Sequence, residues 1–218
     1  MRTQRQLLAI ATALLLASPS LAFQSPLSEE SIREAYFLGQ RHDDTLPRLL
    51  DKYVQYLALP KTGPYVSSIS LFTPFVLAVQ KSSQHTFNYS AQQAQSEHRA
   101  EAEYVVIRVQ IDLTETYGAF LTEPTGSRSG SATGIRLRPS TFWKDFQVEV
   151  SSEDKILDAD FLHGDPNYQC SDGACILSGA TLTLEFPAES FTSDAVTVLV
   201  TPPEGDPVQV DFDLTSFR

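Results

Sequence analysis

The segment EYVVIRVQIDL, residues 103–113, decides the fold class of this chain of 218 residues. Apolar side chains occupy every second position from Val105 onward. Between them lie polar side chains, those of Arg108, Gln110 and Asp112. Because successive side chains of a β-strand point to opposite faces, this period of two predicts a strand with one face buried.

The same alternation returns five times toward the C-terminus, in the segments 135–138, 146–150, 182–186, 196–200 and 208–214. Gly, Pro, Asp and Ser separate these segments, and TPPEGDP at 201–207 is expected to join the last two as a hairpin. The pattern predicts a mainly antiparallel β-sandwich over residues 103–218, of immunoglobulin-like size. The predicted sandwich has no antibody-type disulfide, because the only two cysteines of the chain lie close together in the sequence.

Residues 23–102 are predicted to form a mostly helical segment, which makes the whole chain an α+β protein. Ser28 followed by two glutamates is typical of a helix N-terminus, and the first helix is expected to end at Gly39. The other elements predicted here are helices over 46–57, 74–81 and 91–101 and a strand over 65–72.

A secretory signal peptide is predicted at residues 1–22. Arg2 and Arg5 precede an uncharged apolar run over 7–17, and small residues precede a cleavage site after Ala22. The alternative is a membrane anchor, but a span needs about 20 apolar residues, so this run is too short. We therefore expect an exported protein, periplasmic or extracellular, with no membrane span in its mature chain.

The charge of the chain argues against anionic partners. Loss of Arg2 and Arg5 with the signal peptide changes the formal net charge from −11 to −13. Binding of a phosphate backbone needs clustered lysines and arginines, and those of this chain are scattered. Nucleic acid is therefore not an expected partner.

The cysteines, Cys170 and Cys175, enclose the turn-forming pair Asp172-Gly173. Two nearby cysteines in an exported protein usually form a disulfide, so we predict a bond across a hairpin tip. The gap of four residues differs from that of a thioredoxin-like redox pair. A metal site with His163 and neighbouring aspartates is the weaker alternative.

Sequence-local signatures of catalysis or cofactor binding are missing from the chain, so we predict no catalytic residue, cofactor or metal ligand. The glycine-rich run 126–134 is interpreted as a loop between strands, and NYS at 88–90 matches an N-glycosylation acceptor. Each histidine stands alone in its segment: His42, His85, His98 and His163.

Two further groups leave alternatives open. Oxygen-bearing side chains cluster in one stretch and could hold Ca²⁺, although acidic turns also arise without metal: Asp158, Asp160, Asp165, Asn167 and Asp172. Trp143, in FWKDF, is interpreted as a buried core residue; if exposed, it could stack on a sugar ring or anchor a partner.

These observations favour a non-catalytic binding or assembly module of the cell envelope, whose partner is an envelope or extracellular protein or a glycan. This rests on fold analogy, because sandwich faces and loops suit recognition. Two alternatives remain: a hydrolase whose carboxylates and histidine meet only in space, and a purely structural accessory domain. Carboxylates and a histidine in one pocket would favour the enzyme, and a broad apolar patch would favour a partner site.

The signal peptide gives the first testable prediction. The intact mass of the exported protein should lack residues 1–22. A mass that corresponds to all 218 residues would contradict it.

Overall fold

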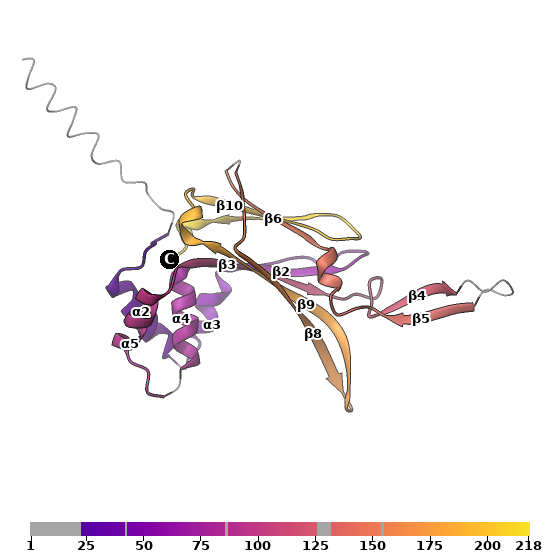
Figure 1. Cartoon of the computed structure of the whole chain (residues 1–218), viewed down its shortest axis with the longest axis horizontal. Helices are drawn as coiled ribbons and strands as arrows, with labels where there is room; N and C mark the ends of the chain where they lie inside the picture. Colours follow the sequence, from indigo (N-terminus) through magenta and orange to yellow (C-terminus); the bar gives the residue numbers. More distant parts are fainter. Residues whose placement is uncertain (1–22, 42, 86, 126–131, 154) are drawn as a thin grey trace, which may run out of the picture.

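The computed structural model describes residues 23–41, 43–85, 87–125, 132–153 and 155–218. Its strands form two stacked antiparallel sheets and a separate two-stranded ribbon, and four described helices lie together at one end (Figure 1). The predicted α+β fold with a mainly antiparallel sheet is confirmed. None of the described helices has the length and apolar character needed to cross a membrane.

The larger sheet has five strands in the order β1-β2-β3-β9-β8. Its members are β1 (Val54–Tyr56), β2 (Tyr65–Phe72), β3 (Tyr104–Asp112), β9 (Ala174–Pro187) and β8 (Phe161–Ser171). The decisive segment is the central strand β3, which pairs with β2 on one side and β9 on the other.

The smaller sheet has four strands in the order β11-β10-β6-β7. They are β11 (Val208–Asp213), β10 (Ala195–Thr201), β6 (Gln147–Ser152) and β7 (Lys155–Leu157). The predicted terminal hairpin is confirmed, since β10 pairs antiparallel with β11. Inward side chains of both sheets, such as Ile107, Leu182 and Val198, form one fully buried core.

The helices cover one end of the outer face of the five-stranded sheet. They are α2 (Glu29–Gly39), α3 (Thr45–Asp51), α4 (Pro74–Gln84) and α5 (Ala91–Ala100). Their apolar side chains form a second core, to which the sheet contributes the cross-strand pair Phe72 and Val106. Val106 departs from the alternation of β3 because this end of the sheet is buried on both faces.

The helix predicted over 46–57 is wrong in its second half. The helix α3 ends at Asp51, and residues 54–56 form β1, an edge strand paired with β2. Tyr53, buried between them, packs against Phe217, so tertiary contacts override the helical spacing of apolar residues. Both β1 and β2 lie in the sandwich, although the sequence assigned residues 23–102 to a mostly helical segment.

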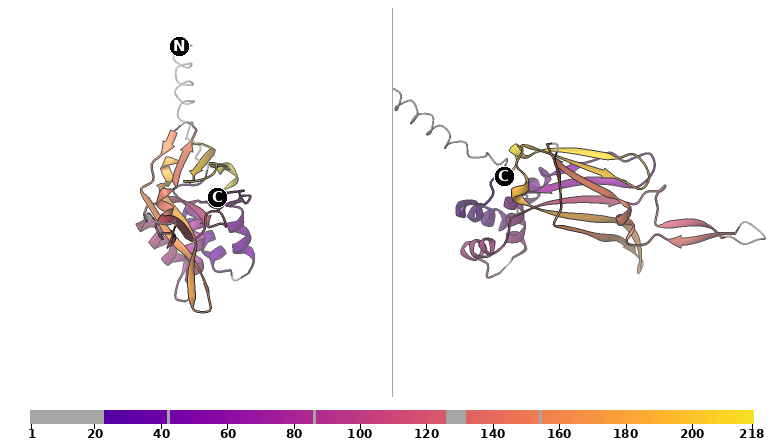
Figure 2. Two further views of the ribbon diagram at one scale, coloured as in Figure 1. Left: turned by 90° about the vertical axis from the view of Figure 1, so that its right-hand side faces the viewer. Right: turned by 45° about the horizontal axis from the view of Figure 1, so that its top comes forward.

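The ribbon consists of β4 (Phe120–Thr125) and β5 (Ala132–Leu137), and Figure 2 shows that it projects beyond the end of the sandwich. Its base is fixed by Arg138. The Arg138 guanidinium lies over the ring of buried Tyr117, at 3.4 Å from the ring centroid, and its Nε donates a hydrogen bond of 2.8 Å to the carbonyl oxygen of Gly118.

The tip of the β8–β9 hairpin carries the two cysteines. Cys170 is the cross-strand partner of Cys175, and their Sγ atoms lie 2.02 Å apart, a disulfide-bond distance. Asp172 and Gly173 form the two-residue turn with φ values of 50° and 82°, the left-handed backbone that favours Asp and Gly there.

Replacement of both cysteines, Cys170→Ser with Cys175→Ser, should lower the free energy of unfolding by about 2 kcal/mol or less, because a small loop loses little entropy on closure. Urea unfolding measures this loss. Thiol titration of the unreduced protein should find no free thiol. Two reactive thiols in the native protein would contradict the bond.

Candidate functional site

A pocket of about 280 Å³ lies where the helices meet the outer face of the five-stranded sheet. Its apolar wall comes chiefly from Leu77 and Ala78 of α4 and from Val106 of β3. Its charged and polar rim comes from four elements and the α5–β3 connection: Lys81, His98, Glu101, Glu103, Arg108, Thr183 and Glu185. A histidine and carboxylates therefore share one pocket, the arrangement that would suit a hydrolase.

Lys81 is engaged by its neighbours. Its Nζ lies 2.7 Å from Glu101 Oε1 and 3.5 Å from Glu97 Oε2. Desolvation, the largest single contribution, lowers the pKa of Lys81, but the hydrogen bonds and charges of the two glutamates together raise it above its ordinary value. This cluster is a partly exposed ion-pair network, and it leaves Lys81 charged.

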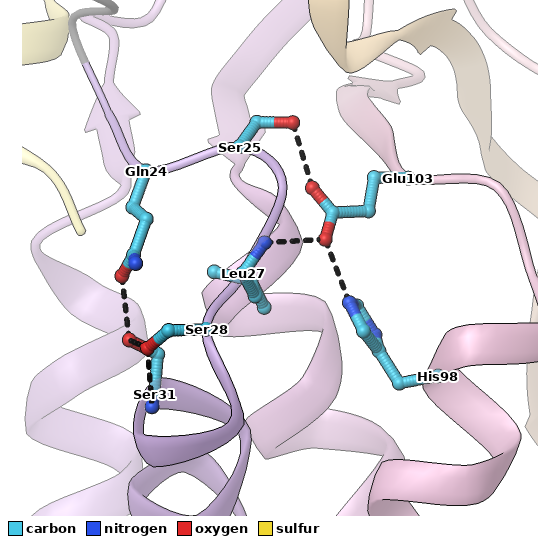
Figure 3. Close-up of polar contacts among 7 residues, drawn as sticks. All are labelled: Gln24, Ser25, Leu27, Ser28, Ser31, His98 and Glu103. Carbon is cyan, nitrogen blue, oxygen red and sulfur yellow. Dashed lines mark hydrogen bonds and ion pairs between the residues drawn. The ribbon is translucent and has the colours of Figure 1, made fainter.

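Both carboxylate oxygens of Glu103 are occupied by groups of the chain itself (Figure 3). Its Oε1 accepts hydrogen bonds of 2.6 Å from the backbone N–H of Leu27 and 2.7 Å from Nε2 of His98. Its Oε2 accepts one of 2.6 Å from the hydroxyl of Ser25. The side chain is only 11% exposed. Glu103 therefore acts as a clamp on the segment that precedes α2.

Burial of Glu103 is the largest influence on its pKa and raises it, yet the hydrogen bonds from His98, Ser25 and Leu27 outweigh burial and lower the pKa. An ionised carboxylate has no proton to donate, and three of the roughly four acceptor positions of Glu103 are already used by Leu27, His98 and Ser25. The geometry therefore assigns Glu103 and His98 to holding the fold together.

The clamped segment is anchored at several further points. Phe23 is buried beside Phe191, with ring centroids 6.3 Å apart. The hydroxyl of Ser31 donates a hydrogen bond of 2.5 Å to Gln24 Oε1, and the backbone N–H of Ser31 donates one of 3.1 Å to the N-cap Ser28 (Figure 3). The N-cap predicted at Ser28 is thus confirmed.

The residues singled out as possible Ca²⁺ ligands lie before β8, along it and in the turn after it, and they do not converge. Asp165 lies 3.1 Å from His163 Nε2, Asn167 donates a hydrogen bond to Thr181, and Asp172 is in the hairpin turn. Over the described ranges, no group of three or more His, Cys, Asp or Glu side chains is placed to share a metal ion. The sequence missed that this stretch is a long edge strand.

Trp143 is half-buried, between the two interpretations given to it. Its ring covers the backbone of Gly164 so closely that a Cβ there would lie 2.2 Å from Cδ2 of the indole. Its exposed neighbours are Lys144, with Nζ 5.5 Å from the ring centroid, and His163. The indole thus packs on β8, and Gly164 is required for that contact.

The other predicted positions do not join the pocket. His85 stacks on Tyr89 with ring centroids 4.0 Å apart, and Asn88 is exposed with a φ of 55°. His42 and most of the glycine-rich run lie outside the described residues.

The ribbon exposes apolar side chains on one face. Phe120 is the cross-strand partner of Leu137, and Ile135 lies two residues from Leu137, so all three share that face. Phe120 is 57% exposed, Leu137 is 66% exposed and Ile135 is 74% exposed. Their apolar area is contiguous along the ribbon, unlike single apolar residues scattered on a surface.

No protein-family model matches this chain, and no curated protein matches its sequence. Function is therefore argued from the geometry of the described residues.

The clamp predicts that Glu103→Gln lowers the free energy of unfolding by about 1–3 kcal/mol, because an amide cannot accept all three hydrogen bonds and a partly buried charge network is broken. Glu101→Gln, which removes a rim ion pair, is the matched control and should cost about 1 kcal/mol or less. Urea unfolding near neutral pH measures both.

The pH dependence of folding stability tests whether Glu103→Gln acts through the lost charge or only through changed side-chain packing. Because the folded-state pKa of Glu103 is lowered, its contribution to stability is complete above the pKa of the unfolded chain and is lost as the pH falls through the folded-state pKa. The stability difference between wild type and Glu103→Gln should therefore shrink in acid. A difference independent of pH would contradict the clamp.

Proposed function

We propose that this protein is a non-catalytic binding or assembly module of the cell envelope, exported to the periplasm or the cell exterior. The observation that carries the proposal is the apolar face of the ribbon, formed by Phe120, Ile135 and Leu137. An apolar surface of this kind gains free energy when a partner removes it from water.

The construction of the ribbon supports docking. A two-stranded ribbon is marginally stable by itself, and a partner packed against its apolar face would stabilise it. Its base is held to the sandwich through Arg138 and Tyr117, so the apolar face is presented by a fixed support. Rigid presentation reduces the entropy lost on binding. The partner that fits is an envelope or extracellular protein with an apolar surface; a glycan fits less well, since Phe120 is the one aromatic residue of the three.

The hydrolase alternative has weaker support. Its best pair, His98 and Glu103, is occupied by hydrogen bonds that hold the segment before α2. Lys81 is likewise paired with Glu101. A general acid or base needs to reach the proton it transfers, and these groups are already committed.

Partner docking predicts the effect of a ribbon variant with three changes, Phe120→Thr, Ile135→Thr and Leu137→Thr. Threonine keeps β-propensity while it removes apolar area, so folding stability should change by about 1 kcal/mol or less. A photo-crosslinking residue at Thr122, on the same face, should capture one defined envelope protein in the producing cells, and the triple variant should reduce that capture at least about tenfold.

The control is Ile156→Thr, which removes a side chain of similar exposure, 57%, from β7. It should leave the capture unchanged. Equal crosslinking by wild type and a folded triple variant would reject the ribbon as the docking surface, and would favour a purely structural role.

A further inference from the structure

Arg108 occupies an unusual place in this acidic protein. It lies on the outer face of β3, at the boundary between the part of the sheet that the helices cover and the part left open. Its guanidinium lies over the ring of Phe72, 5.2 Å from the centroid. Within the described residues it has no hydrogen-bond acceptor and no ion-pair partner, so its five N–H donors are available.

An apolar wall of the pocket lies next to the Arg108 guanidinium. Val106 precedes Arg108 on the same face of β3, and Leu77 and Ala78 of α4 complete the wall of the 280 Å³ pocket. Thr183 lies directly across from Arg108 on β9 and adds a hydroxyl to the rim. A cationic fork beside a small apolar hollow is suited to a ligand with an anionic head and an apolar body.

The other charges of the rim limit the charge of that ligand. Lys81 is neutralised by Glu101, and Glu103 is held by His98 and the segment before α2. Glu185, opposite Val106, has no partner for its carboxylate among the described side chains. Glu185 therefore opposes a second negative charge near Arg108, which disfavours a phosphate dianion and favours a single carboxylate.

We propose that this pocket binds a carboxylate attached to a short apolar group, with the carboxylate on Arg108 and the apolar group against Leu77, Ala78 and Val106. This site goes beyond the docking function of the ribbon and does not depend on it. The carboxylate could belong to a small free acid or to the C-terminus of a peptide with an apolar last residue, since both present the same chemistry.

Calorimetric titration of the purified protein tests the site with two pairs of probes. Hexanoate is compared with hexanamide, and glycyl-glycyl-leucine with its C-terminal amide. Each carboxylate should bind at least about tenfold more tightly than its amide, because only the ionised group forms charge-assisted hydrogen bonds with the guanidinium. Tighter binding of hexanoate identifies a free acid as the source, and tighter binding of the tripeptide identifies a peptide C-terminus.

Two variants test the carboxylate contact and the apolar contact of the ligand independently. Arg108→Gln should remove the preference for carboxylate over amide, whereas Arg33→Gln, at an exposed position on α2, should keep it. Ala78→Phe fills the apolar hollow and should weaken both carboxylates at least about tenfold with Arg108 intact.

Three outcomes would overturn the proposal. They are equal binding of acid and amide, an Arg108→Gln protein that keeps the preference, and the absence of binding by either carboxylate up to about 10 mM. Urea unfolding of each variant confirms that it is folded. Because the ribbon is tested by crosslinking, failure of the pocket and failure of the docking function give different results.

Discussion

The carboxylate of Glu103 joins parts of the chain that are far apart in the sequence. It lies one residue before β3, and its two oxygens bind the segment before α2 and the imidazole of His98 on α5. Its backbone carbonyl oxygen also accepts a hydrogen bond of 3.0 Å from Ala188, directly after β9. The helices and the segment before α2 are thereby attached to the sheet at the point where the central strand begins, beside the pocket.

The partial cover that the helices give to the sheet explains why a pocket exists there. The helices bury the row of Phe72 and Val106 and stop before the next row along the strand, which contains Arg108 and Thr183. Apolar and charged side chains therefore meet at the edge of the cover. Helices that covered more of the sheet would bury the Arg108 guanidinium without a partner, at a high cost in desolvation. Helices that covered less of it would expose Phe72 and Val106 to water.

The sequence predicted the strands with strong alternation and also β2, which lacks it, but missed β1, β4, β7 and most of β8. The strands β3, β9, β10 and β11 each bury alternate side chains in the shared core, so the period of two is clear. By contrast, β8 is an edge strand in which only Gly164 is buried. Its polar residues therefore show no period of two, and the sequence analysis interpreted them as acidic turns. Pro166 in β8 fits this edge position, because proline is tolerated there.

The pocket could not have been predicted from local motifs, since its residues come from α4, α5, β3 and β9. The sequence did name His98 as a lone histidine, but its partner depends on how α5 is placed on the sheet. Charged side chains of the same residue types at this rim therefore fall into two groups, those with partners in the chain and those without them among the described residues. Those with partners in the chain, Glu103 and Lys81, stabilise the fold, whereas Arg108 and Glu185 keep their binding capacity at the rim. Hydrogen-bond satisfaction, more than residue type, therefore decides which groups of this rim can act on a ligand.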